Sequence, residues 1–112
     1  MLREIKGTQR LSRLLGLRVD GTGTASILEG VNDAVLTDNG VGDWTLTWAK
    51  PFARVPEVVA MPLAVDVVLS IVPGSLTNAA VQIKARSVAA SPAAADCDFH
   101  VIVLGSDAVD ET

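Results

Sequence analysis

The stretch Trp44-Thr45-Leu46-Thr47-Trp48 decides the fold class of this 112-residue chain. Apolar and polar residues alternate, so both tryptophans and Leu46 share one face and the two threonines share the other. Aromatic and β-branched residues in this order predict a half-buried strand with its tryptophan face on a core. Two tryptophans can also bind a sugar or stack on a base, but at strand spacing beside Leu46 they favour the core.

Short runs of the same kind continue on both sides of this strand. Turn-forming residues separate them at intervals of roughly 8–12 residues, and no segment after residue 17 has a helical period. Connections this short suit antiparallel neighbours, because a parallel crossover needs about a dozen or more residues. The sequence therefore predicts an all-β fold, a small antiparallel β-sandwich of jelly-roll-like kind, with a small barrel as the alternative. The other expected strands are Leu17–Asp20, Ala25–Leu28, Ala34–Thr37, Val58–Met61, Val65–Val72, Val81–Ala85 and Phe99–Leu104.

The expected strand Val65–Val72 is almost continuously apolar and β-branched. This composition is typical of a strand that is covered on both faces. Its one charged residue, Asp66, then either pairs at an interface or faces solvent, since an unpaired buried carboxylate is costly. The sequence leaves these two alternatives open.

Charge divides the chain into two parts. Residues 1–18 hold five basic residues against Glu4, a balance of +4, whereas residues 19–112 hold four basic residues against twelve acidic ones, a balance of −8. We therefore predict a basic N-terminal arm over residues 1–18 and a sandwich body over residues 19–112 with an acidic C-terminal tail. The apolar spacing leaves a short helix around Gln9–Leu15 and an extended arm both open. The residues expected to bind a partner are Arg3, Lys6, Arg10, Arg13 and Arg18.

Two clusters of polar residues are candidate sites of chemistry. Asp96, Cys97, Asp98 and His100 could form a thiolate–imidazole pair or a metal site, but strand alternation turns Cys97 and His100 to opposite faces. The segment Asp38–Asp43 offers oxygen ligands for calcium, yet Asp-Asn-Gly is a strong turn signal and the later glutamate of an EF-hand is absent. With one cysteine, one histidine and no phosphate-binding loop, we expect no enzyme activity, no metal and no cofactor.

Composition also bears on the class of partner. The net charge of −4 disfavours a general nucleic-acid binder, whose affinity comes from neutralising phosphates. The longest near-apolar run, Val58–Val72, is interrupted by polar residues and is shorter than the roughly 20 residues of a membrane-spanning helix. The N-terminus has no apolar run of the signal-peptide type. We therefore expect neither nucleic acid nor a membrane as partner, and no export signal.

Two segments share the pattern of a known group of proteins. The run Leu-Thr-Asp-Asn-Gly-Val-Gly-Asp-Trp-Thr-Leu-Thr-Trp-Ala-Lys-Pro-Phe-Ala-Arg-Val-Pro-Glu-Val-Val-Ala-Met-Pro-Leu over Leu36–Leu63 joins a turn, an alternating strand, Pro-Phe-Ala and a valine-rich strand. The closing Asp-Cys-Asp-Phe-His-Val-Ile-Val-Leu-Gly over Asp96–Gly105 has the form of a last strand. Together these segments cover about a third of the chain. They resemble small virion structural proteins of tailed bacteriophages, including capsid decoration (cement) proteins and fibre-head modules.

The resemblance implies a non-enzymatic virion protein that forms a homo-oligomer, with a trimer as the expected state. A high apolar content in so small a body also favours association. We expect a capsid decoration protein that binds the major capsid protein on the outer surface of the head, in virions assembled in the host cytoplasm, and stabilises contacts between capsid subunits. The alternative is a head-fibre or tail-fibre adhesin module that contacts a host receptor or glycan.

Overall fold

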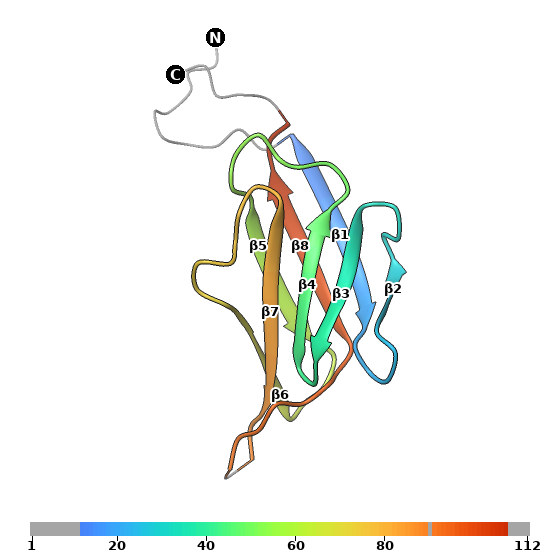
Figure 1. Cartoon of the computed structure of the whole chain (residues 1–112), viewed down its shortest axis with the longest axis vertical. Helices are drawn as coiled ribbons and strands as arrows, with labels where there is room; N and C mark the ends of the chain where they lie inside the picture. Colours follow the sequence, from blue (N-terminus) through green and yellow to red (C-terminus); the bar gives the residue numbers. More distant parts are fainter. Residues whose placement is uncertain (1–11, 90, 108–112) are drawn as a thin grey trace.

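Two four-stranded β-sheets pack face to face in the computed structural model, which describes residues 12–89 and 91–107 (Figure 1). All neighbouring strands are antiparallel. The predicted all-β sandwich is therefore confirmed. No helix in the part of the chain described is long and apolar enough to cross a membrane. The strands are β1 (Arg13–Asp20), β2 (Ser26–Glu29), β3 (Ala34–Gly40), β4 (Asp43–Trp48), β5 (Glu57–Pro62), β6 (Val67–Ile71), β7 (Ala80–Ser87) and β8 (Phe99–Gly105).

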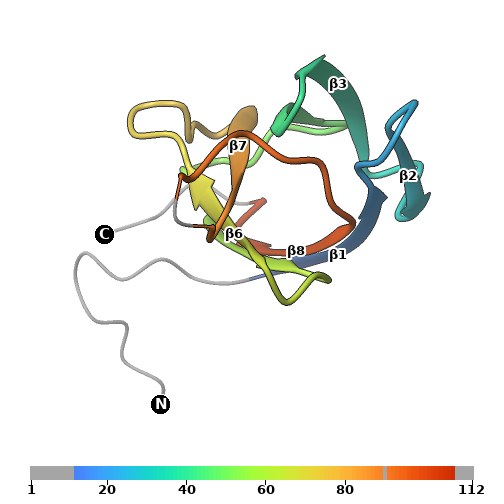
Figure 2. The same ribbon diagram turned by 90° about the horizontal axis from the view of Figure 1, so that it is seen from below.

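Strand order places the two ends of the sandwich body side by side. The first sheet, here called sheet A, has the order β2-β1-β8-β5, and the second, sheet B, has the order β3-β4-β7-β6. Hairpins β1–β2, β3–β4 and β6–β7 stay within one sheet, and the remaining connections cross between the sheets. Figure 2 shows β1 and β8 in one layer, facing β3 and β7 in the other. The first and last strands therefore form the centre of sheet A.

Alternating side chains from both sheets fill the core. Trp44 and Phe99 meet between the sheets with ring centroids 4.8 Å apart and planes tilted by 46°. Both tryptophans are buried, so their predicted place in the core is confirmed. Sheet A contributes Leu15, Leu17, Val19, Phe99, Val101 and Val103, and sheet B contributes Ala34, Trp44, Leu46, Trp48, Val67, Val81, Ile83 and Ala85.

The predicted boundary of the arm at residue 18 is wrong. Strand β1 begins at Arg13 and pairs with β8 from Arg13 opposite Gly105 to Val19 opposite Phe99. Leu15 and Leu17 alternate with outward-facing residues and are buried in the core. Summing the charge over residues 1–18 hid this period-two pattern. Arg13–Leu15 is therefore extended rather than helical, and residues 1–11 lie outside the described part of the chain.

Strand β6 corrects a second expectation. It lies at the edge of sheet B and pairs only with β7 among the described strands, so it is not a central strand covered on both faces. Val65 and Asp66 form the turn that precedes it, and both are exposed to solvent. Asp66 therefore lies on the surface of the body, where both alternatives, pairing at an interface and exposure to solvent, place it.

The segment Asp38–Asp43 forms the predicted turn. It closes the β3–β4 hairpin, with positive φ angles of 130° at Gly40 and 63° at Gly42. A φ in this range favours glycine, because a Cβ atom is strained there. The Asp38 carboxylate accepts the Gly40 N–H at 3.0 Å, so the acidic residues serve the hairpin itself.

Candidate partner-binding surface

The outer face of sheet B is mainly polar, apart from the exposed Val35 and Val68, and its polar side chains bind one another. The Asp43 carboxylate accepts hydrogen bonds from Gln82 Nε2 at 2.8 Å and Asn39 Nδ2 at 3.3 Å. Asn39 Nδ2 also donates to Thr45 Oγ1 at 2.8 Å, and Lys84 Nζ lies 3.9 Å from Asp43 Oδ2. Polar groups that satisfy one another in this way suit a face that stays in water.

The outer face of sheet A is largely apolar. The exposed fractions of its side chains are 66% for Leu14, 54% for Val59, 55% for Met61 and 45% for Ile102. Contiguous apolar surface of this kind marks an interaction site on a soluble protein. We call this surface the sheet A face. Its outward residues on β1, β8 and β5, with the residue that follows β5, are Leu14, Gly16, Arg18, His100, Ile102, Leu104, Glu57, Val59, Met61 and Leu63.

Strand register arranges these residues in three rows across the sheet. Leu14, Leu104 and Glu57 form the first row, at the end where β1 begins. Gly16, Ile102 and Val59 form the second row. In the third row Arg18 and Met61 flank His100, and Glu29 of β2 lies on the far side of Arg18. The first two rows are therefore mainly apolar, and the third is mainly polar.

A hollow of about 160 Å³ opens at Gly16 in the second row. Apart from Gly16 itself and its two neighbours in the chain, no residue has a heavy atom within 4 Å of the position that a Cβ of Gly16 would take. The missing side chain leaves a gap between Arg18 and Ile102 that a partner's side chain can enter. Its lining residues are Gly16, Leu17, Arg18, Glu29, His100, Val101 and Ile102.

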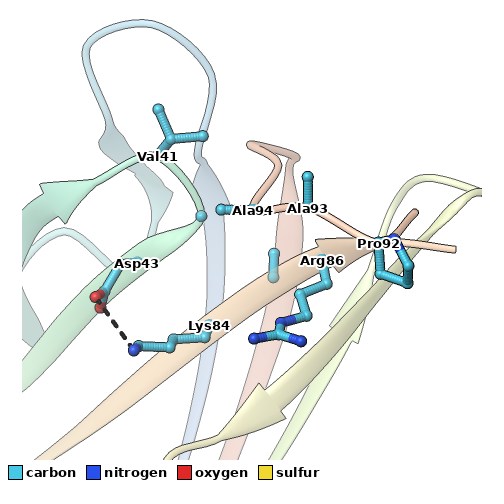
Figure 3. A pocket seen from close by; sticks show the side chains of 9 residues that line it. Val41, Asp43, Lys84, Arg86, Pro92, Ala93 and Ala94 are labelled. Carbon is cyan, nitrogen blue, oxygen red and sulfur yellow. Dashed lines mark ion pairs between the residues drawn. The ribbon is translucent and has the colours of Figure 1, made fainter. Parts of the chain in front are cut away.

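A second hollow, of about 230 Å³, lies between the β3–β4 turn, β7 and Pro92–Ala94 (Figure 3). Its charged residues are Asp43, Lys84 and Arg86. Figure 3 draws the ion pair between Asp43 and Lys84. Lys84, one of the two basic residues, is already paired with Asp43. The hollow is therefore a weaker site for an anionic ligand than its composition suggests.

The structure separates the basic residues that were predicted to bind a partner. The Arg13 guanidinium carbon lies 4.3 Å from the centre of the Phe52 ring, and Nη1 donates to the Lys50 carbonyl at 2.6 Å and lies 3.4 Å from Asp107 Oδ1. Arg13 is thus engaged within the body, and its side chain is only 14% exposed. Arg18 does reach the sheet A face. Arg3, Lys6 and Arg10 lie outside the described residues.

The structure separates the residues of the cluster around Cys97. Cys97 is buried in the core, whereas His100 is exposed on the sheet A face, as strand alternation predicts. Burial raises the pKa of the Cys97 thiol, and the charges of Asp98, Asp96 and Asp66 raise it further. A thiol held in its protonated form is a poor nucleophile and metal ligand. Within residues 12–89 and 91–107, no three histidine, cysteine or acidic side chains gather to hold a metal ion.

The two aspartates beside Cys97 have structural roles. Asp96 Oδ1 accepts the Gly42 N–H at 2.8 Å and so ties the chain before β8 to the β3–β4 hairpin. Burial raises the pKa of Asp98, and a hydrogen bond and the charge of Asp20 add to the increase. The hydroxyl and N–H of Thr22 hold the pKa of Asp20 below its ordinary value, at distances of 2.7 and 3.0 Å. Asp20 and Asp98 therefore form a carboxyl pair whose pKa values are shifted in opposite directions.

Comparison with protein-family models, with curated proteins and with solved structures finds no match. Function is therefore inferred from the residues of this chain. Reasoning from the sequence missed Gly16, Val59 and Ile102 as a common surface. The available signal was that Val58–Met61 and Phe99–Leu104 carry apolar residues at both odd and even positions, although antiparallel sheets often leave one face polar.

Proposed function

We propose that this chain is a non-enzymatic virion structural protein of the capsid-decoration type. The observation that carries the proposal is the apolar sheet A face on a body whose core is already filled. Such a body can associate through this face into an oligomer, which suits a protein that reinforces a larger, symmetric assembly. The resemblance of Leu36–Leu63 and Asp96–Gly105 to phage virion proteins supplies the class of assembly.

The proposed partner is the major capsid protein on the outer surface of the head. With β1 assigned to the body, residues 1–11 hold Arg3, Lys6 and Arg10 against one acidic residue, Glu4. These three basic residues are proposed to dock on an acidic part of the capsid, since opposite charges steer and orient association. Arg13 is removed from this group because Phe52, Lys50 and Asp107 already engage it.

Repetition on the lattice would make weak contacts sufficient. A homo-oligomer, with a trimer as the proposed state, presents several copies of residues 1–11 to neighbouring capsid subunits. Once one copy is bound, the others bind at high effective concentration. The proposed location is the capsid surface of the virion, reached during assembly in the host cytoplasm.

Binding to purified, expanded heads that lack this protein tests the proposal. We expect the chain to co-sediment with heads and to raise the temperature at which they break. A variant with Arg3→Gln, Lys6→Gln and Arg10→Gln should bind at least about tenfold more weakly, whereas the matched control Lys84→Gln on sheet B should bind like the wild type. Binding to host cells but not to heads would replace this proposal with the adhesin alternative.

A further inference from the structure

We propose that the sheet A face is a self-association surface on which Val59 of one copy inserts into the Gly16 hollow of the next. The inference rests on the proposed function only in taking this face as a binding surface, and it names the occupant as a second copy of this chain. Self-association can be measured without capsids. Its failure and the failure of head binding are therefore separate results.

The register of sheet A places a projecting side chain, Val59, and the Gly16 hollow at the same level along the strands. Gly16 and Val59 are both cross-strand neighbours of Ile102, one on β1 and the other on β5. With strands spaced about 4.8 Å apart, the hollow and the projecting valine lie about 10 Å apart on opposite sides of β8. A twofold or threefold rotation axis that runs parallel to β8 in front of the face brings the β5 side of one copy onto the β1 side of the next and keeps each row aligned, so this contact is compatible with the proposed trimer. Val59 then meets Gly16.

The side chains of the second row fit this contact. Val59 is 54% exposed and is free to enter a neighbouring surface. The Gly16 hollow holds about 160 Å³ and has no atom within 4 Å of the position of a Cβ. Ile102 lies on the axis and packs against its own copy in the neighbour. Apolar side chains that fill a hollow at the centre of a face are the usual anchors of a protein interface.

The charged residues of the sheet A face allow a second copy of the chain to cover it. In the third row Met61 of one copy faces Arg18 of the next, and the aliphatic part of an arginine can pack against an apolar side chain. Arg18 and Glu29 are cross-strand neighbours, so this row carries one positive and one negative charge within each copy. In the first row, at the rim of the face, Glu57 of one copy faces Leu14 of the next, and a rim carboxylate keeps its access to water.

The size of the face also suits a second copy. Four strands about 4.8 Å apart and about 20 Å long present roughly 400 Å² per copy, so two covered faces bury roughly 800 Å², the size of a weak and reversible contact. The edges of sheet A are poorer candidates, because β2 has four residues and β5 ends in Pro62, and short strands and prolines blunt an edge. We therefore expect face-to-face association in the micromolar range.

Exchanging the two side chains provides a direct test. Analytical ultracentrifugation of the full chain from about 1 to about 500 μM should show reversible association. Gly16→Val fills the hollow and Val59→Gly removes the projecting side chain, so each should raise the dissociation constant at least about tenfold. The double variant restores a valine opposite a glycine and should return to within about threefold of the wild type. The matched control Val35→Gly, at an exposed valine of sheet B, should associate like the wild type.

Circular dichroism on the same samples establishes that each variant is folded. If Val59→Gly loses the fold, Gly16→Val remains decisive, because open space surrounds that position and valine suits a strand. A chain that stays monomeric throughout the concentration range overturns the inference, as does a Gly16→Val variant that associates like the wild type. A double variant no better than either single variant overturns the direct contact. Heads that bind a monomeric chain would leave the proposed function standing without this interface.

Discussion

The guanidinium of Arg13 stacks on the ring of Phe52, with 4.3 Å between the guanidinium carbon and the ring centre. Phe52 in turn meets Trp48 edge to face, with ring centroids 6.0 Å apart and an interplanar angle of 87°. Arg13 also donates to the carbonyl of Lys50 at 2.6 Å. The start of β1 is thereby fastened to the connection that follows β4, which joins the two sheets.

We predict that Arg13→Met lowers the free energy of unfolding by about 1–2 kcal/mol, through loss of the cation–π contact and of a hydrogen bond from a charged donor. Urea unfolding of the purified chain measures this. Arg18→Met is the matched control, because Arg18 is exposed on the same strand, and it should change stability by less than about 0.5 kcal/mol. Equal losses in the two variants would contradict a structural role specific to Arg13.

Two truncations of different length should differ in folding. A chain lacking residues 1–11 keeps all of β1, so we expect a β-type circular dichroism spectrum and cooperative unfolding. A chain lacking residues 1–18 loses Leu15 and Leu17 from the core and most of the partner of β8, and it should not fold cooperatively. A folded 19–112 fragment would show that β1 is dispensable. That outcome would return the boundary to the position predicted from charge.

Glycine substitutions separate packed from open positions. A Cβ at Gly21 would lie 2.2 Å from the Cys97 carbonyl oxygen and 2.7 Å from Trp44, so we predict that Gly21→Ala costs about 2 kcal/mol or more. Gly16→Ala meets no atom within 4 Å and should change stability by at most about 1 kcal/mol, in the stabilising direction. Thermal or urea unfolding at low concentration compares the two. A loss at Gly16 as large as that at Gly21 would show that the hollow is not open.

The sequence predicted the positions of the strands better than it predicted which strands pair with one another. Local alternation, as in Trp44–Trp48 and Phe99–Leu104, depends only on side chains two residues apart, so it identified core-facing residues. Pairing between strands depends on residues far apart in the chain. The edge position of β6 therefore could not be derived, and its apolar composition suggested a central strand instead.

The candidate site shows the same limit. Gly16, Ile102 and Val59 become one row only through the register of β1, β8 and β5, which no local pattern states. The charge count over residues 1–18 also merged two different segments, because Arg13 and Arg18 belong to a strand whose other face is apolar. The net charge of residues 1–18 therefore does not mark a boundary in the fold.

The carboxyl pair of Asp20 and Asp98 predicts a pH dependence of stability. Burial chiefly raises the pKa of Asp98, so the folded state holds its proton more tightly than the unfolded state does. Between the ordinary pKa and the raised one, the folded state therefore binds more protons, and the contribution of Asp98 to stability falls as pH rises. Asp20 acts in the opposite sense, since its pKa is lowered chiefly by the Thr22 hydroxyl.

Asp98→Asn removes the group with the raised pKa while keeping a similar shape. We predict that this variant gains stability relative to the wild type as pH rises from about 3 to about 7, because only the wild type must leave a charged carboxylate at this position. Urea unfolding of both chains across this range gives the difference directly. Since burial is the main cause, the difference should persist in about 1 M salt, where charges are screened beyond about 3 Å. Stability curves that run parallel from acidic to neutral pH would contradict the prediction.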